Sequence, residues 1–262
     1  MKCYLCGNDR FKPIYSYNEP DKYLKAIGLI INSRTWWHCE QCGLYFNSNG
    51  LTQKQLEDVY LRYRDSEMRG TSVAEEFERI QALPVSENKL RCIWLSHNIA
   101  DKRPQSMLDI GSGLGVFPYE MKKAIPHVCC IEPEAESATF INNKLNINCF
   151  NGFYKKGMFG ESELVTLVHV LEHFKDPIGT LKDIKEHDLK PNGTLFIEVP
   201  DAEEFEYLDK QHDEFNSLHL WFFTVGTLDR ILRKAGFISY RFERVKYKER
   251  NLSRIRCLAD AI

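Results

Sequence analysis

A glycine-rich loop follows an apolar segment near the middle of the chain, in the sequence Leu108-Asp-Ile-Gly-Ser-Gly-Leu-Gly115. Glycines at such a place allow positive φ angles and let a ligand approach the backbone, and a helix that begins there offers free N–H groups. Glu132 follows Gly111 by 21 positions, a spacing at which a carboxylate can accept hydrogen bonds from both ribose hydroxyls. The loop and the carboxylate together predict a site for a nucleoside.

The charge beside this loop distinguishes two classes of nucleoside. A dinucleotide site requires a third glycine where this chain has Val116, and the carboxylate of Asp109 would repel a pyrophosphate. S-adenosylmethionine carries a sulfonium and an ammonium group, which the same carboxylate would attract. We therefore expect S-adenosylmethionine as the ligand. The alternative is that the glycines only form a tight turn.

Three segments carry a family resemblance: the loop at 108–115, Val168-His-Val-Leu-Glu-His173 and Leu189-Lys-Pro-Asn-Gly-Thr-Leu195. Together they resemble class I S-adenosylmethionine-dependent methyltransferases of the type 11 and type 12 groups, over residues 85–245. The resemblance implies an enzyme of the α/β class, with a seven-stranded Rossmann-like sheet whose last strand runs antiparallel.

The resemblance also implies six cofactor contacts: Asp109, Gly111 and Gly113 on the methionine half, Glu132 on the ribose, His169 near the sulfur or the ribose, and Asn151 on the adenine. At the last of these positions the family often has Asp or Glu. The amide of Asn151 can still accept a hydrogen bond from the adenine amine.

Four cysteines form two C-x-x-C pairs, and a glycine follows each pair directly. Such pairs are typical of two zinc knuckles that face each other, in which a tight turn brings backbone N–H groups to the thiolates. The predicted zinc ligands are Cys3, Cys6, Cys39 and Cys42. Four thiolates leave no open coordination position, so we expect a structural role for the zinc ion. His38 is an alternative ligand, but a surface histidine explains it better.

Methyl transfer from a sulfonium requires an in-line approach and often a base for the acceptor's proton. His219 is the predicted base, because imidazole titrates near neutral pH and the aromatic residues 221–223 would exclude water. His173 is a second catalytic candidate. For His219 the alternative is a histidine packed among core aromatics.

Three hypotheses for the acceptor stay open. The zinc pairs, a helix with Tyr60 and Tyr63, and the late His–aromatic motif resemble sugar C-methyltransferases, which implies a nucleotide-linked sugar, a surface-polysaccharide precursor or another small polar acceptor. A zinc knuckle also resembles ribosomal-RNA guanine methyltransferases, and residues 241–256 carry a net charge of +5 that could hold a phosphate of RNA or of a nucleotide-linked sugar. The third hypothesis is a non-catalytic module that binds the cofactor and docks a protein partner. We favour the small acceptor over nucleic acid.

Strands and helices alternate from Pro104 onward, as a parallel sheet covered on both faces requires. The predicted strands are 106–110, 127–131, 147–150, 164–168, 194–199, 237–245 and 254–258, and the predicted helices are 116–124, 134–146, 177–187 and 227–235.

We expect three regions along the chain: a zinc-ribbon-like module at 1–47, a helical linker and lid at 48–100, and the methyltransferase domain at 101–262. Within the linker, 51–60 and 86–100 are predicted helices, and the polar segment 62–76 between them is predicted to be a mobile connection.

The composition is that of an ordinary globular chain: 262 residues, 43% of them hydrophobic, with 35 Lys and Arg against 37 Asp and Glu. A net charge of -2 gives no overall attraction to nucleic acid or to an acidic membrane. We find no apolar run near the ~20 residues that cross a bilayer, and the expected location is the cytoplasm. Nine unevenly placed cysteines favour metal and core roles over a disulfide framework.

Overall fold

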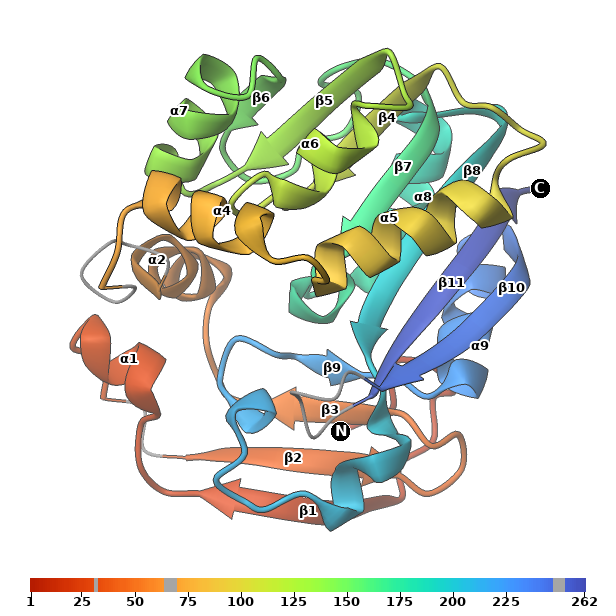
Figure 1. The fold of residues 1–262 in the computed structure, drawn as a ribbon. Coiled ribbons are helices and arrows are strands. Elements are labelled where there is room, and N and C mark those ends of the chain that lie inside the picture. The colour runs from red at the N-terminus through yellow and green to blue at the C-terminus, as the bar shows by residue number, and fades with distance from the viewer. Residues whose placement is uncertain (31–32, 64–69, 247–252) are drawn as a thin grey trace.

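A computed structural model describes residues 1–30, 33–63, 70–246 and 253–262, and it contains a seven-stranded sheet (Figure 1). The strands of this sheet are β4 (Ser106–Ile110), β5 (His127–Glu132), β6 (Asn148–Asn151), β7 (Ser162–Val168), β8 (Leu189–Pro200), β10 (Phe237–Lys246) and β11 (Ser253–Ala261). They lie in the order β10-β11-β8-β7-β4-β5-β6. The pairs from β8 to β6 are parallel, whereas β11 runs antiparallel to both of its neighbours. The predicted α/β class and the antiparallel last strand are confirmed.

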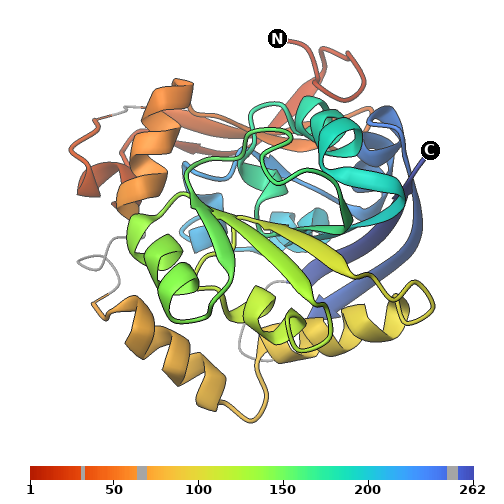
Figure 2. The same cartoon turned by 90° about the horizontal axis from the view of Figure 1, so that it is seen from above.

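Helices cover both faces of this sheet because successive side chains of each strand point to opposite sides. Met107 and Leu164 pack in one buried cluster, and their neighbours Leu108 and Val165 pack in another. The first face carries α4 (Val73–Ala82), α5 (Glu87–Asn98), α6 (Val116–Met121) and α7 (Ala135–Asn143), and the second carries α8 (Pro177–His187) and α9 (Val225–Lys234). Figure 2 shows α4 and α5 on one side of the sheet and α8 on the other.

Local signals fix several helix ends. The side chain of Ser86 accepts a hydrogen bond from the Lys89 N–H, as expected of an N-cap, and Gly236 has a φ of 86° just after α9. The prediction of a mobile connection across 62–76 is wrong at both ends, because α2 (Gln53–Tyr63) continues to Tyr63 and α4 begins at Val73 with a capping box. Residues 64–69 of that connection lie outside the described residues.

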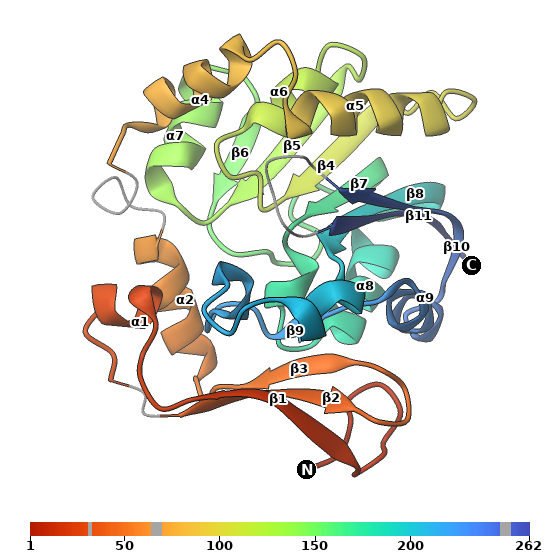
Figure 3. The same cartoon turned by 60° about the horizontal axis from the view of Figure 1, so that its bottom comes forward.

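A second, smaller sheet lies beyond the carboxyl ends of the parallel strands (Figures 1 and 3). Its strands, in the order β1-β2-β3-β9, are β1 (Phe11–Tyr17), β2 (Arg34–Cys39), β3 (Tyr45–Ser48) and β9 (Trp221–Phe222). The last of these comes from the far end of the sequence. Trp36 stacks on Phe222 with ring centroids 4.3 Å apart, so the N-terminal strands share a core with residues 221–222.

Two further helices, α1 (Lys22–Ala26) and α2 (Gln53–Tyr63), stand at the side of this small sheet. They share a buried cluster in which Leu24 and Val59 meet Leu218 and Leu220 of a later loop. Among the described residues, no helix has the length and apolar character needed to cross a membrane.

Candidate functional site

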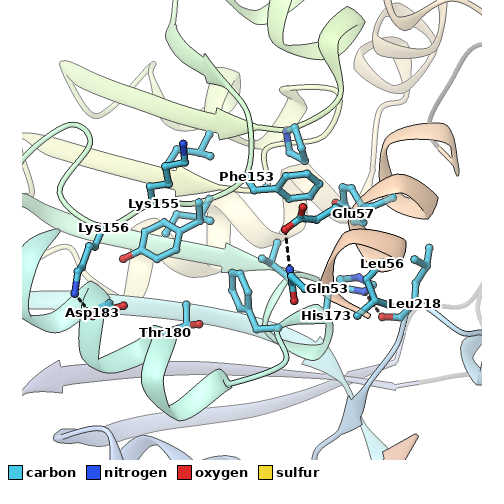
Figure 4. Close-up of a pocket in the computed structure, with 18 residues that line it drawn as sticks. Gln53, Leu56, Glu57, Phe153, Lys155, Lys156, His173, Thr180, Asp183 and Leu218 are labelled. Atoms are coloured by element: carbon cyan, nitrogen blue, oxygen red, sulfur yellow. Dashed lines mark hydrogen bonds and ion pairs between the residues drawn. The ribbon is translucent and has the colours of Figure 1, made fainter. Parts of the chain in front are cut away.

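A cavity of about 480 Å³ lies at the carboxyl ends of β4 and β5. Ile110, Gly111, Ile131 and Pro133 form its wall on the sheet side. Figure 4 shows the opposite walls: α2 contributes Gln53, Leu56 and Glu57, and the segment after β6 contributes Phe153, Lys155 and Lys156. A ligand crevice at the carboxyl edge is the usual place for one in an open parallel sheet.

The glycine loop keeps this cavity open and close to the backbone. Gly111 has a φ of 75°, and a Cβ at this position would lie 2.5 Å from Cγ2 of Val170. Gly115 precedes α6 with a φ of 77°, and a Cβ there would lie 2.7 Å from Ile141. A side chain at either position would clash with these neighbours and hold a strained φ, so glycine is strongly favoured at both, and the loop can bring its backbone close to a ligand at this edge.

Glu132 and Asp109 lie near the ends of β5 and β4, but both side chains are buried and neither lines the cavity. The carboxylate of Glu132 accepts hydrogen bonds from the N–H groups of Gly113 at 2.6 Å and Glu134 at 2.9 Å, which tie the loop to the end of β5. Asp109 accepts a hydrogen bond from the hydroxyl of Thr166 at 2.6 Å. Burial raises the pKa of Asp109 to about 6, although the Thr166 hydroxyl acts in the opposite direction.

Asn151 is exposed at the end of β6, and its amide donates to the carbonyl oxygens of Glu132 and Pro133. Asn151 is not among the residues that line the cavity. Of the eight sequence-predicted cofactor and catalytic residues, Gly111 and His173 line this first cavity.

A second cavity of about 260 Å³ adjoins the first, and Tyr60, His173 and Leu218 line both. Its lining is mostly polar and comes from seven parts of the chain: Tyr23, Tyr60, Glu87, His169, Glu172, His173, Pro200, Asp213, Glu214, Asn216, Leu218, His219 and Arg254. The structure therefore brings His169, His173 and His219 together around one cavity.

His169 adopts a φ of 56°, in the left-handed region that costs energy for a residue other than glycine. Its ring lies between two buried carboxylates, with Nε2 3.3 Å from Glu198 and Nδ1 3.6 Å from Glu172. Burial by itself would lower the pKa of His169, but the nearby carboxylates of Glu172 and Glu198 raise it above its ordinary value.

His173 and His219 face each other with ring centroids 4.9 Å apart. Nδ1 of His173 lies 2.9 Å from the carbonyl oxygen of Leu218, and Nδ1 of His219 lies 2.8 Å from that of Glu214. A carbonyl oxygen only accepts hydrogen bonds, so each Nδ1 carries a proton and each neutral ring has its lone pair on Nε2. The side chain of His219 is 13% exposed and lies at a cavity wall.

Sequence reasoning missed Glu172 and Arg254 as residues of this site. Glu172 belongs to the 3-10 helix η1 (Leu171–His173) and is fully buried at the cavity. Arg254 belongs to the basic segment 241–256 and is also buried, where it pairs with Glu214 at 2.9 Å. The signal available for Glu172 was its position directly before His173.

A third cavity of about 550 Å³ shares Tyr23, Asp213 and Asn216 with the second. Four of its lining residues are cationic, three are acidic and three are aromatic: Lys22, Lys25, Arg34 and Lys210; Glu19, Asp21 and Asp213; Tyr17, Tyr23 and Phe215.

The four predicted zinc ligands lie together, with their sulfur atoms within 4.8 Å of one another. The Cys3–Cys42 and Cys6–Cys39 sulfur distances are both 3.6 Å, close to the ~3.8 Å that tetrahedral Zn–S bonds of about 2.3 Å require. The two turns have equivalent bonds, since the N–H of Gly7 donates to the Cys3 carbonyl and that of Gly43 to the Cys39 carbonyl. The sulfur set therefore fits a zinc ion.

Comparison with protein families gives a match to the methyltransferase domain over residues 79–238. No curated protein matches this chain in sequence.

Three solved structures illustrate the similarity of fold. The 1,6-didemethyltoxoflavin-N1-methyltransferase of Burkholderia thailandensis is 17% identical, with 85% of this chain and 96% of that one covered and a TM-score of 0.57. The magnesium protoporphyrin IX methyltransferase of Synechocystis PCC 6803 is 14% identical, with 79% and 100% covered and a TM-score of 0.57. An S-adenosylmethionine-dependent methyltransferase of Clostridium acetobutylicum is 11% identical, with 72% and 97% covered and a TM-score of 0.56.

Proposed function

Because the chain belongs to the methyltransferase-domain family and is an S-adenosylmethionine-dependent methyltransferase, we propose that its acceptor is a small polar molecule, a nucleotide-linked sugar. The observation that carries this proposal is the polar second cavity, which shares His173, Tyr60 and Leu218 with the cavity at the glycine loop. A donor in the first cavity and an acceptor in the second would meet at these shared residues.

The first cavity is the proposed site of S-adenosylmethionine, which supplies a methyl group on a positively charged sulfur when bound. The similar structures from Burkholderia thailandensis and Synechocystis contain S-adenosylhomocysteine. In this chain, the close approach permitted at Gly111 and the apolar wall of Ile131 and Pro133 suit an adenosine group. We assign direct contact with the cofactor to Gly111, which lines the first cavity, and we assign Asp109, Gly113, Glu132, Asn151 and His169 to the proposed cofactor site as residues placed around that cavity.

Glu132 provides the test of this assignment, since Ile131 and Pro133 on either side of it line the cavity. Glu132→Ala should weaken the binding of S-adenosylmethionine by about 10–100-fold, the cost of lost charge-assisted hydrogen bonds. Calorimetric titration measures this change, and an unaltered affinity would remove Glu132 from the cofactor site.

The second and third cavities fit the two parts of a nucleotide-linked sugar. The second is small and rich in hydrogen-bonding side chains, as a sugar ring requires. The third adjoins it and offers cationic side chains such as Lys25 and Lys210 for a diphosphate and the ring of Tyr17 for a base.

His219 and His173 are the proposed groups that promote loss of the acceptor's proton. Each presents an Nε2 lone pair, because Nδ1 faces a backbone carbonyl in both rings. The aromatic ring of Phe222 lies 5.3 Å from that of His219 and helps to exclude water. The cysteine cluster, with zinc bound, has a structural part in this proposal: it holds the small sheet, whose strands β1 and β2 contribute Tyr17 and Arg34 to the third cavity.

The basic segment at the end of the chain supports a small acceptor rather than RNA. Four of its described cations pair with carboxylates of the same chain: Arg244 with Asp201 and Glu203, Lys246 with Glu204, Arg254 with Glu214, and Arg256 with Glu198 and Glu243. Arg241 is exposed. Paired cations form a poor surface for a phosphate backbone.

Single-turnover transfer from methyl-labelled S-adenosylmethionine tests the proposal. The acceptors are nucleoside-diphosphate sugars, the same sugars without the nucleotide, and ribosomal-RNA fragments. We expect label on the nucleotide-linked sugar and a slower reaction with the free sugar. Label in RNA, or RNA binding that falls steeply with salt, would replace the proposal with RNA modification. Bound cofactor with no label on any acceptor would support a non-catalytic module.

The third cavity has its own matched variants. Lys25→Gln should slow the reaction of the nucleotide-linked sugar and leave that of the free sugar unchanged, because only the former carries a diphosphate. Lys144→Gln, at the exposed end of α7, is the control. Equal effects of both variants would place the nucleotide elsewhere.

A further inference from the structure

We propose that Glu172, His173 and His219 bind a divalent transition-metal ion in the acceptor cavity. One ligand atom from each residue lies within 4.8 Å of the others, a separation that an ion at the centre would bridge. All three residues line the second cavity, so the ion would be accessible to the acceptor. The role of the ion in methyl transfer rests on the proposed function, whereas its binding does not.

The carboxylate of Glu172 is the first argument for this ion. The residue is 0% exposed, and within the described part of the chain neither of its oxygens has a hydrogen-bond partner. The ring of His169 is 3.6 Å away at Nδ1, beyond hydrogen-bond distance, and it also contacts Glu198. A buried carboxylate normally has hydrogen bonds, an ion pair or a metal ion, and a metal ion would use both of the unpartnered oxygens.

The orientation of the two imidazoles is the second argument. In both rings Nδ1 donates to a backbone carbonyl, that of Leu218 for His173 and that of Glu214 for His219. This arrangement fixes the tautomer with the lone pair on Nε2, and it is the outer-shell arrangement that metal-binding histidines usually have. The two carbonyl oxygens thus hold both rings in the tautomer in which Nε2 can bind a metal ion.

Of the charges around Glu172, His169 lies 3.6 Å away and is shared with Glu198, which lies closer to it at 3.3 Å. Arg254 lines the same cavity, but its guanidinium donates to Glu214 at 2.9 Å. Glu214 also lies 3.3 Å from Nδ1 of His219, opposite the nitrogen that would bind the metal. An ion bound to Glu172 would therefore meet no unpaired cation from these groups.

Two imidazole nitrogens and one carboxylate favour zinc, manganese, iron(II) or cobalt over magnesium or calcium. Three protein ligands leave coordination positions open, as in catalytic metal sites. The open positions face the acceptor cavity, so the expected further ligand is an oxygen of the acceptor. The imidazoles would then act as ligands of the ion. The ion would lower the pKa of an acceptor hydroxyl bound to it, and the hydroxyl proton would pass to water.

Binding of Mn²⁺ alone tests the proposal, without cofactor or acceptor. The full chain is first loaded with one equivalent of zinc, which the four thiolates of the cysteine cluster retain. Electron paramagnetic resonance then measures free Mn²⁺ during a titration. We expect one Mn²⁺ per chain, and binding weakened by more than about 10–100-fold in each of Glu172→Gln, His173→Asn and His219→Asn.

His127→Asn is the matched control, because His127 is exposed at the opposite, amino end of β5. Absence of Mn²⁺ binding to the unaltered chain, or equal binding by the control and all three ligand variants, would overturn the proposal. Methyl transfer to a nucleotide-linked sugar in the absence of such binding would leave the proposed function standing.

A second variant guards against loss of folding. His219→Cys exchanges one ligand for another, so Co²⁺ added to the zinc-loaded variant should give a sulfur-to-cobalt absorption band that the unaltered chain lacks. A folded His219→Cys protein without this band would also contradict the site.

Discussion

Two clusters of potential metal ligands in this chain, the four cysteines and the group Glu172, His173 and His219, have the same compactness but different origins. In each, the ligand atoms lie within 4.8 Å of one another. The cysteines come from two short turns with equivalent backbone bonds and leave no open position for a ligand. The second cluster joins η1 to a loop more than 40 residues later, and it lines a cavity. Local spacing therefore marks the closed site, whereas the open site exists only after the fold has formed.

The two regions are also connected. Asn47, at the end of the cysteine-bearing sheet, donates from its amide to the carbonyl oxygens of Asn216 and His219 at 3.1 and 3.0 Å. The Leu220 N–H donates to the carbonyl of Glu172 at 2.9 Å, and β9 follows directly and pairs with β3. The cysteine cluster can therefore influence the acceptor cavity through a rigid sheet.

The largest expected effect is that of Cys39→Ser. Loss of one of four thiolates should release zinc and lower the free energy of unfolding by about 5 kcal/mol, a part of what structural zinc contributes to folding. In a chain of this size we expect the midpoint of thermal unfolding to fall by about 10–20 °C. Elemental analysis and thermal melts measure both changes. Cys129→Ser, in β5 away from the cluster, should retain zinc; if both variants retain it, the closed site is not a zinc site.

His219→Ala should affect turnover rather than stability. The cavity wall loses an imidazole whose ring is partly exposed, so the fold should persist while turnover falls by about 10²–10⁴-fold. That loss corresponds to about 3–5 kcal/mol of transition-state stabilisation. Steady-state kinetics and cofactor titration separate the two effects. Full turnover with unchanged cofactor affinity would make His219 a packing residue, and the cluster of Glu172, His173 and His219 would then have no demonstrated role in catalysis.

The sequence predicted the seven strands of the large sheet and helices α6 to α9 well, because apolar runs separated by glycine turns specify strands without reference to distant partners. It also predicted the four sulfur atoms, since each C-x-x-C pair folds locally. The β9 strand has only two residues, and its pairing with β3 depends on chain segments about 175 positions apart, so no local pattern indicates it.

Glu172 and Arg254 escaped sequence reasoning for a related reason. Arg254 pairs with Glu214 and Glu172 lies near His219, and these contacts form only in the folded chain. Most charged side chains in proteins are exposed to solvent, and a sequence alone therefore predicts exposure. Glu172 and Arg254 are buried instead. The roles assigned to the individual cofactor residues stay predictions.

Asp109 can be compared with Glu172, since both are buried carboxylates. A hydroxyl, that of Thr166, lies beside Asp109, whereas imidazoles lie beside Glu172. Burial raises its pKa in the folded protein to about 6 from an ordinary 3.8, so the folded state holds the proton more tightly. Stability should therefore fall as the pH rises from about 4 to about 6, by about 3 kcal/mol in total.

Asp109→Asn should remove this dependence. The variant should be more stable than the unaltered chain at pH 7.5 by up to about 3 kcal/mol and nearly equal to it near pH 4. Denaturant unfolding at the two pH values measures the difference. The same variant should bind the positively charged cofactor more weakly, so a gain in both stability and cofactor affinity would contradict the assignment of Asp109.

The smallest effect concerns the connection between the two clusters. Asn47→Leu removes two hydrogen bonds that reach the acceptor loop and leaves the carbonyls of Asn216 and His219 without these donors, at a cost of about 2 kcal/mol in the free energy of unfolding. Zinc should stay bound, because the cysteine turns are untouched, while a displaced His219 should lower turnover and weaken Mn²⁺ binding. Ser48→Ala, at the next position of the same strand, removes two hydrogen bonds within the small sheet, those with Trp37 and Thr35, and should leave zinc, turnover and Mn²⁺ binding unchanged. If Asn47→Leu loses stability but keeps turnover and Mn²⁺ binding, the sheet supports the fold without positioning the site, and the two clusters act independently.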